Sequence, residues 1–259
     1  MSIPVRPVPF PDAPIADAGT QAIVENGWRK AARARGYDLV DRWENPPFPG
    51  LLFRNGTSVV ATDVVQSTAG ANPFTAGSLT AEYVAAGGDV HASFVAIRLP
   101  RSMPNIVLVN ARRGALHQAN IGMGSRQMMR LEGSYDSAFT LYCPIGHERI
   151  AADIFTPDLM QVFMDSLPGG DIELFDEWMF VYEEEGRFTS ADALNRVERV
   201  GLRVQDEIVR RDFASLHEDP VPEQTSSTGA TMGGPQFAVV LAFCAVAATL
   251  VGVWGFGAY

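Results

Sequence analysis

Histidine is the first residue type to test for chemistry, because an imidazole can bind a metal or move a proton near neutral pH. The chain has four: His91, His117, His147 and His217. His147-Glu148 begins like the His-Glu-x-x-His helix of a zinc protease, but Ala151 stands where the second histidine must lie on the same helix face. Cys143 has no neighbouring ligand that would complete a zinc set. The sequence therefore predicts no metal site.

The glycine and serine motifs of common enzymes are incomplete. Gly122-Met123-Gly124-Ser125 resembles part of a phosphate loop, but a third glycine and a following Lys-Ser or Lys-Thr pair are missing. No serine stands in a Gly-x-Ser-x-Gly elbow, and no histidine has a context that would assign it to a triad. We therefore expect no cofactor, leave the catalytic residues unassigned, and favour a protein without catalytic activity while leaving an enzyme open.

The charge balance argues against one class of partner. The 259 residues include 20 Lys and Arg against 30 Asp and Glu, which gives a formal net charge of −10. Neutralising phosphates requires clustered cations, whereas acidic residues are interspersed with nearly every basic residue here. The sequence therefore predicts no nucleic-acid partner.

The last stretch of the chain, Phe237 to Tyr259, is apolar throughout and contains no charged residue. About 23 helical residues span about 35 Å, enough to cross a hydrocarbon core of about 30 Å. We therefore expect a transmembrane helix over residues 236–259, in contact with the lipid bilayer. Small residues on it offer faces for close helix approach and so for a homo-oligomer: Ala238, Ala242, Ala245, Ala248 and Gly252.

The sequence before this stretch contains no export signal. The opening MSIPVRPVPFPDAP is broken by prolines and lacks the apolar core of a secretory signal. A disulfide between Cys143 and Cys244 would have to join the soluble domain to the membrane helix, so nothing indicates an oxidising compartment. The nearest basic residues, Arg210 and Arg211, lie too far away to orient the span. We expect a tail-anchored, single-pass protein of the cell membrane, with its soluble domain in the cytosol.

The rest of the chain divides into three parts. Residues 1–17 are expected to form a proline-rich disordered arm, residues 18–217 one soluble α+β domain, and residues 218–235 a flexible linker. Thr20 is the expected N-cap of a first helix that ends at Gly36. Its last turns contain a basic group, which suits the helix dipole better than it indicates a phosphate or lipid-headgroup site: Arg29, Lys30, Arg33 and Arg35.

Alternating apolar residues predict a mainly antiparallel sheet. The expected strands are Tyr37–Trp43, Leu51–Phe53, Ser58–Val65, Phe74–Tyr83, Val90–Leu99, Asn105–Val109, Ala138–Tyr142, Asp171–Phe175 and Trp178–Tyr182. Asn55-Gly56 predicts a hairpin turn, and Pro100 and Pro104 predict a break between two strands. Val90–Leu99 is apolar on both faces and is expected to be central. The last two strands are expected to pair as a hairpin.

The segments between and after the strands complete the expected domain. Ala115–Arg126 is expected to be irregular, and Glu183–Gly186 to be a solvated acidic turn. His147–Ile154 predicts a short helix, and Thr156-Pro157-Asp158 predicts the start of another. Ser190–His217 predicts a long amphipathic helix whose apolar seam is short, which favours docking on the sheet over a coiled-coil dimer.

Several short stretches between Tyr37 and Trp178 are distinctive when they are taken together. They are Gly36-Tyr37 with Trp43, Pro47-Phe48, Ser58-Val59-Val60, Val95-Ala96-Ile97-Arg98-Leu99-Pro100 with Pro104, Phe139-Thr140-Leu141-Tyr142 and Phe155-Thr156-Pro157-Asp158-Leu159-Met160. This set resembles an uncharacterised family of largely actinobacterial membrane-associated proteins, known only as a domain of unknown function. The resemblance implies a soluble domain paired with membrane spans and implies no activity. The single C-terminal span of this chain departs from that family.

These features favour a membrane-anchored binding or scaffolding module with a cytosol-facing α+β domain, for which a protein is a candidate partner. The alternative is a membrane-tethered hydrolase whose active site leaves no linear motif. A buried cluster of His, Asp and Ser in a concave pocket would favour the hydrolase. An exposed apolar groove would favour the module.

Overall fold

The computed structural model describes part of the 259-residue chain: residue 11 and residues 26–68, 73–112, 114–121, 127–131, 135–167, 169–188 and 190–210. The expected linker and membrane helix lie outside these residues, as does the expected arm except for Pro11, so all three remain predictions. Among the described residues, no helix combines the length and the apolar character that a bilayer crossing needs.

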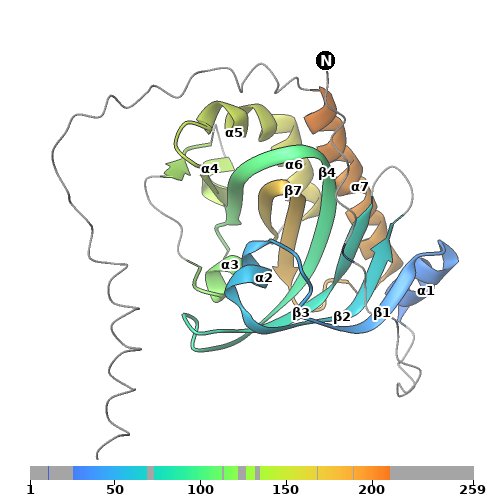
Figure 1. Ribbon diagram of the computed structural model, residues 1–259. Helices are drawn as coiled ribbons and strands as arrows, with labels where there is room; N and C mark the ends of the chain where they lie inside the picture. Colours follow the sequence, from blue (N-terminus) through green and yellow to red (C-terminus); the bar gives the residue numbers. More distant parts are fainter. Residues whose placement is uncertain are drawn as a thin grey trace, which may run out of the picture. The chain divides into compact units, whose positions relative to one another are not determined.

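The described residues form an α+β fold built on an antiparallel sheet, as predicted (Figure 1). The strands are β1 (Asp38–Glu44), β2 (Thr57–Ser67), β3 (Phe74–Tyr83), β4 (Gly88–Asn110), β5 (Met128–Met129), β6 (Phe139–Tyr142) and β7 (Asp171–Glu184). The helices are α1 (Gly27–Ala34), α2 (Leu51–Asn55), α3 (Ala115–Gln118), α4 (Tyr135–Ala138), α5 (Glu148–Ile154), α6 (Pro157–Ser166) and α7 (Ala191–Arg210).

The sheet is organised around β4. Its strands are hydrogen-bonded in the order β1-β2-β3-β4-β6-β5, and β7 also pairs with β4. The first half of β4 pairs with β3, as in Ile97 opposite Phe74, and the second half pairs with β6, as in Val107 opposite Tyr142. β7 follows β4 through both halves. The predicted central position of Val90–Leu99 is therefore confirmed.

Two predicted strand breaks are wrong. β4 runs through Pro100 and Pro104 as one strand, and its pairing with β7 shifts register between Arg98 and Ile106. Proline is tolerated where a bulge removes the need for a ladder donor, so the prolines bend β4 without ending it. β7 is likewise one strand instead of a hairpin, and Asp176, with φ of 53°, lies at its irregularity. Aspartate tolerates this left-handed backbone better than most residues.

The segment predicted as strand Leu51–Phe53 is instead helix α2, so the hairpin predicted at Asn55-Gly56 is wrong. A short apolar run does not distinguish a buried strand from a buried helix turn, and tertiary contacts decide between them. Gly56 has an extended backbone and joins α2 to β2. The first N–H of α2, on Leu51, is bound by a side chain of β7 that is described below.

The predicted helices are confirmed more closely than the turns. Thr156 caps α6, with its Oγ1 accepting from the Leu159 N–H, and Pro157 takes the first helical position. α1 begins at Gly27 behind an Asn26 cap, later than predicted, and Thr20 lies outside the described residues. Ala115–Gln118, within a segment predicted to be irregular, forms the short helix α3.

Two apolar clusters cover the two faces of the sheet. Alternate β4 residues divide between them, with Phe94 and Ala96 in one cluster and Val95 and Ile97 in the other. The first cluster also takes in buried residues of α2 and α3, and the second those of α1, α5, α6 and α7. α7 contacts β4, α1 and α6, which confirms that this helix docks on the domain.

Candidate functional site

Three carboxylates on β7 are buried, and they are the first candidates for chemistry. Asp171 and Glu173 have no exposed surface, and Glu183 is 3% exposed. Glu183 was expected in a solvated turn, but it belongs to the strand, where its side chain packs inward and only Glu184 and Glu185 face solvent. Burial raises the pKa of Glu183, while Arg196 and Arg187 lower it.

Asp171 binds the N–H groups around α3. Its Oδ1 accepts from the Asn110 N–H at 2.8 Å, and its Oδ2 accepts from the Leu116 N–H at 2.9 Å. Burial raises the pKa of Asp171 to about 6, although both hydrogen bonds act to lower it. Gly114 packs against this carboxylate so closely that a Cβ there would overlap it. Asp171 therefore fixes α3 to the sheet.

Glu173 does the same for α2. Its Oε2 accepts from the Leu51 N–H at 2.7 Å and from the Tyr182 hydroxyl at 2.9 Å, and its Oε1 lies 3.7 Å from Arg54 Nη2. Burial raises the pKa of Glu173 to about 7, whereas these three partners lower it. The Tyr83 hydroxyl adds a 2.5 Å hydrogen bond to the Leu52 carbonyl.

These two β7 carboxylates have structural partners that account for their burial. Backbone N–H groups at the start of a short helix need an acceptor, and a buried carboxylate supplies one. A perturbed pKa is common in active sites, but structural hydrogen-bond networks produce it too. Both oxygens of Asp171 and Oε2 of Glu173 accept hydrogen bonds within the fold. Oε1 of Glu173 has no hydrogen-bond partner and lies 3.7 Å from Arg54 Nη2.

Arg29 and Arg35, two residues of the basic group at α1, have structural partners other than the helix dipole. Arg29 is 5% exposed and forms ion pairs with Asp41 on β1 at 2.5 Å and with Asp63 on β2 at 2.8 Å. Arg35 pairs with Glu198 on α7 at 3.3 Å. The prediction that this group serves the helix dipole is therefore wrong for Arg29, because its guanidinium joins α1 to the sheet.

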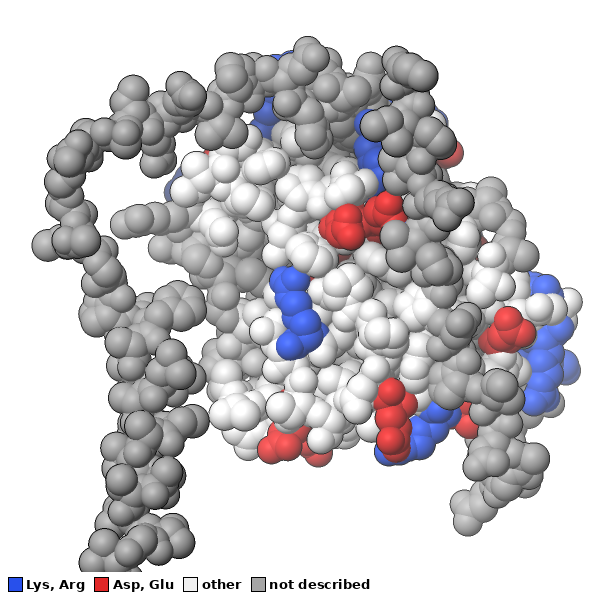
Figure 2. Space-filling model, in the orientation of Figure 1, with Lys and Arg blue, Asp and Glu red and all other residues white. Residues whose placement is uncertain are grey.

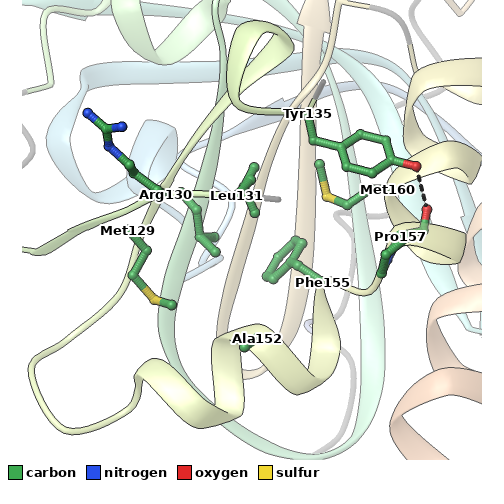
Figure 3. Close-up of a pocket in the computed structure, with 9 residues that line it drawn as sticks. Met129, Arg130, Leu131, Tyr135, Ala152, Phe155, Pro157 and Met160 are labelled. Atoms are coloured by element: carbon green, nitrogen blue, oxygen red, sulfur yellow. Dashed lines mark hydrogen bonds between the residues drawn. The ribbon is translucent and has the colours of Figure 1, made fainter. Parts of the chain in front are cut away.

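A cavity of about 330 Å³ lies between β5, β6, α4, α5 and α6, and we call it the methionine pocket (Figure 3). It is lined by Met129, Arg130, Leu131, Tyr135, Leu141, Ala152, Phe155, Pro157 and Met160. Figure 3 shows Phe155 at its centre, with Leu131, Tyr135 and Met160 around it. A pocket with this lining suits the apolar part of a ligand.

Few polar groups reach the methionine pocket. The Tyr135 hydroxyl donates to the Pro157 carbonyl at 3.1 Å, so its proton is already used. Arg130 supplies the one charge among the lining residues, and Figure 3 shows its guanidinium extending away from Phe155. Cys143 is buried, with its Sγ 3.1 Å from Met129 Sδ, and burial raises the pKa of its thiol.

A second hollow, of about 470 Å³, lies where α6 begins and α7 ends. It is lined by Thr156, Pro157, Asp158, Glu207 and Arg210. Thr156 already caps α6, with its Oγ1 accepting from the Leu159 N–H. This polar hollow is therefore a weaker candidate than the methionine pocket.

The three histidines that the structure describes lie on or beside three different elements. His91 lies on β4, 3.1 Å from Thr80 Oγ1, His117 lies on α3, and His147 precedes α5. His217 and the Gly122–Ser125 segment lie outside the described residues. Within the described residues, no three His, Cys, Asp or Glu side chains gather closely enough to hold a metal ion.

The surface in the orientation of Figure 1 has mixed charge. Figure 2 shows acidic and basic side chains interspersed on this face, with uncharged side chains covering most of its described area. The basic residues on this face therefore form no continuous stripe of the kind that follows a nucleic-acid backbone.

Comparison with known proteins gives one distant likeness. No protein-family model matches the chain, and no curated protein sequence matches it. The chain is structurally similar to the mycobacterial trehalose monomycolate transport factor A, TtfA, with a TM-score of 0.46 and 14% sequence identity. The match covers 74% of this chain and 93% of that one. A likeness at this distance transfers no residue role and no activity.

Proposed function

We propose that this protein is a membrane-anchored binding module. Phe237 to Tyr259 holds it in the bilayer, its α+β domain faces the cytosol, and the methionine pocket binds the apolar part of a ligand. The single observation that carries the binding role is this cavity of about 330 Å³, with apolar side chains around Phe155.

The chemistry of the lining supports binding. Transfer of apolar surface from water contributes roughly 25 cal/mol per Å², so a ligand chain gains most of its affinity from such walls. Met129 and Met160 add flexible, polarisable side chains, which adapt to irregular ligands more readily than branched ones.

The alternative, a membrane-tethered hydrolase, requires a nucleophile and a base within hydrogen-bonding reach of each other. None of the nine residues that line the methionine pocket is Ser, Cys, His, Asp or Glu. Asp171 and Glu173 are buried carboxylates that could serve as a base, but both already accept hydrogen bonds from backbone N–H groups at α3 and α2. The pocket therefore favours the binding module over the hydrolase.

The binding role is tested by filling the pocket. Ala152 lines it and is exposed, so Ala152→Trp adds a ring at the pocket without disturbing the buried core. With the full chain in lipid nanodiscs, an uncharged alkyl alcohol bearing a diazirine should label residues 128–131 and 152–160, and Ala152→Trp should reduce that labelling several-fold. Arg149→Trp, on an exposed position of the same helix, is the matched control and should leave it unchanged. Equal labelling of Ala152→Trp and the unchanged protein would refute the role.

The membrane role has its own tests. Protease added outside intact cells should leave the domain uncut, and digestion of Ser2 to Gly186 would show that the cytosolic orientation is wrong. If the small residues of the span mediate self-association, Gly252→Leu should lower the oligomeric state in membranes. An unchanged oligomeric state would remove the span as the contact surface.

A further inference from the structure

We propose that the ligand of the methionine pocket is a single-chain anionic amphiphile, whose alkyl chain lies against Phe155 and whose acidic headgroup pairs with Arg130. This inference rests on the proposed binding function and adds the chemical class of the ligand. Three observations support it: the volume of the cavity, the hydrogen bonds that already occupy the polar groups around it, and the position of Arg130, the one charged residue that lines it.

The size of the pocket limits the ligand to a slender molecule. Its volume of about 330 Å³ stands at the lower end of the range of roughly 300–1,000 Å³ that small-molecule pockets occupy. The walls come from five separate elements that meet around Phe155, and most of the lining side chains are apolar. A single alkyl chain fits this space better than a two-chain lipid does.

Among the polar side chains around the pocket, Arg130 is the one that can bind a ligand headgroup. The Tyr135 hydroxyl donates its proton to the Pro157 carbonyl. The Asp136 carboxylate accepts from the Leu131 N–H at 3.2 Å. Arg130 is solvent-exposed and has no acidic partner among the residues that the structure describes.

Arg130 is placed to recognise an anion. It follows Met129, which lines the pocket from β5, and Figure 3 shows its guanidinium on the side away from the apolar centre. A guanidinium binds a carboxylate or a phosphate through two parallel N–H donors. An amphiphile with its chain at Phe155 would thus present its charged end beside this side chain.

The test compares three diazirine probes of one chain length on the full chain in lipid nanodiscs: a fatty acid, the matching alcohol and the matching amine. Labelling of residues 128–131 and 152–160 is mapped by mass spectrometry and normalised to labelling of the nanodisc scaffold. An exposed ion pair is modest, so the acid should label up to about fivefold more than the alcohol. The amine should label least.

Substitutions then assign the headgroup contact. Arg130→Gln should remove the preference for the acid while leaving alcohol labelling unchanged, and Arg130→Lys should retain part of it. Arg112→Gln is the matched control, because Arg112 is exposed and does not line this pocket.

Three other labelling results would each contradict part or all of the proposal. Equal labelling by acid and alcohol would refute the anionic headgroup while the apolar binding function stands. A phospholipid with a diazirine chain that labels the pocket more than the free acid would refute the single-chain ligand. Labelling of the bilayer with none in the pocket, by any probe, would refute both this inference and the proposed function.

Discussion

The carboxylates of β7 and the methionine pocket differ in where polar groups and empty space occur. Asp171 and Glu173 have raised pKa values and complete burial, and each accepts hydrogen bonds from nearby donors. The methionine pocket has space of about 330 Å³ and no carboxylate, thiol, hydroxyl nucleophile or histidine among its lining residues.

This difference teaches that a titratable group with unusual properties need not mark the site of function. Glu173 meets several criteria for a catalytic acid, yet its partners are the first N–H of α2 and a buried tyrosine. The pocket would be overlooked in a search for reactive residues, because binding an alkyl chain needs apolar walls instead of reactive groups. Substitutions in the two regions should differ in their effects on stability and on binding.

The largest effect is expected from Glu173→Leu. This change leaves the Leu51 N–H and the Tyr182 hydroxyl without their buried acceptor, and it leaves Arg54 without its partner. Each buried donor left unsatisfied costs about 1–3 kcal/mol, so the loss of this acceptor should lower the unfolding free energy by about 2–5 kcal/mol. Denaturant unfolding followed by tryptophan fluorescence measures it, with the exposed Glu184→Leu as control. A loss below about 1 kcal/mol would break the structural interpretation of Glu173.

The next effect is a dependence of stability on pH. The folded pKa values of Asp171 and Glu173, about 6 and about 7, stand above their ordinary values of 3.8 and 4.5. The folded state therefore binds more protons in this interval, so unfolding free energy should fall as pH rises from about 4 to about 7, by at most about 1.4 kcal/mol per pH unit for each group. Glu173→Gln should flatten the profile between about pH 4.5 and 7. An unaltered profile would show that Glu173 does not titrate there.

A smaller effect is expected from Gly114→Ala. The new Cβ would overlap the Asp171 carboxylate and push it from the N–H groups that it binds. Overpacking of this kind costs about 1–3 kcal/mol. Gly169→Ala is the matched control, because a Cβ there meets no atom within 4 Å. Equal unfolding free energies for the two variants would show that Asp171 can move without cost.

The smallest effect on stability is expected from Ala152→Trp. Because Ala152 is exposed, the unfolding free energy of the protein should change by no more than about 0.5 kcal/mol. Labelling of the methionine pocket should fall several-fold. Glu173→Leu should show the opposite pattern: a large loss of unfolding free energy with unchanged labelling of the methionine pocket. The labelling is measured without denaturant, where the variant is still folded. A variant that lost stability and binding in parallel would show that the two regions are not separate.

Local features predicted the regular elements well. α6 begins where the Thr156-Pro157 sequence places it, and the apolar seam of α7 predicted which of its faces is buried, including Leu194 and Val204. Capping and periodicity are properties of a few neighbouring residues, so a sequence alone carries them. The strands β1 to β3 were predicted for the same reason.

The errors occur where distant residues decide the local structure. Leu51–Phe53 lies in a helix whose first N–H is bound by Glu173, more than a hundred residues away in the chain. β4 continues past Pro100 and Pro104 because β7 pairs with it on both sides of the irregularity. Alternation of Asp171 and Glu173 with Ile172 and Leu174 gave no sign that the polar face is covered, since a period of two is also typical of a solvated face.

The sequence by itself determined the acidic character of the chain, its antiparallel α+β class, its capped and amphipathic helices, and an apolar stretch from Phe237 to Tyr259 long enough to cross a bilayer. Only the tertiary structure decided that the β7 carboxylates hold α2 and α3, and that residues from Met129 to Met160 enclose the methionine pocket. The physical reason is that burial and cavity shape depend on which distant elements pack together. No local pattern of residue types specifies that packing.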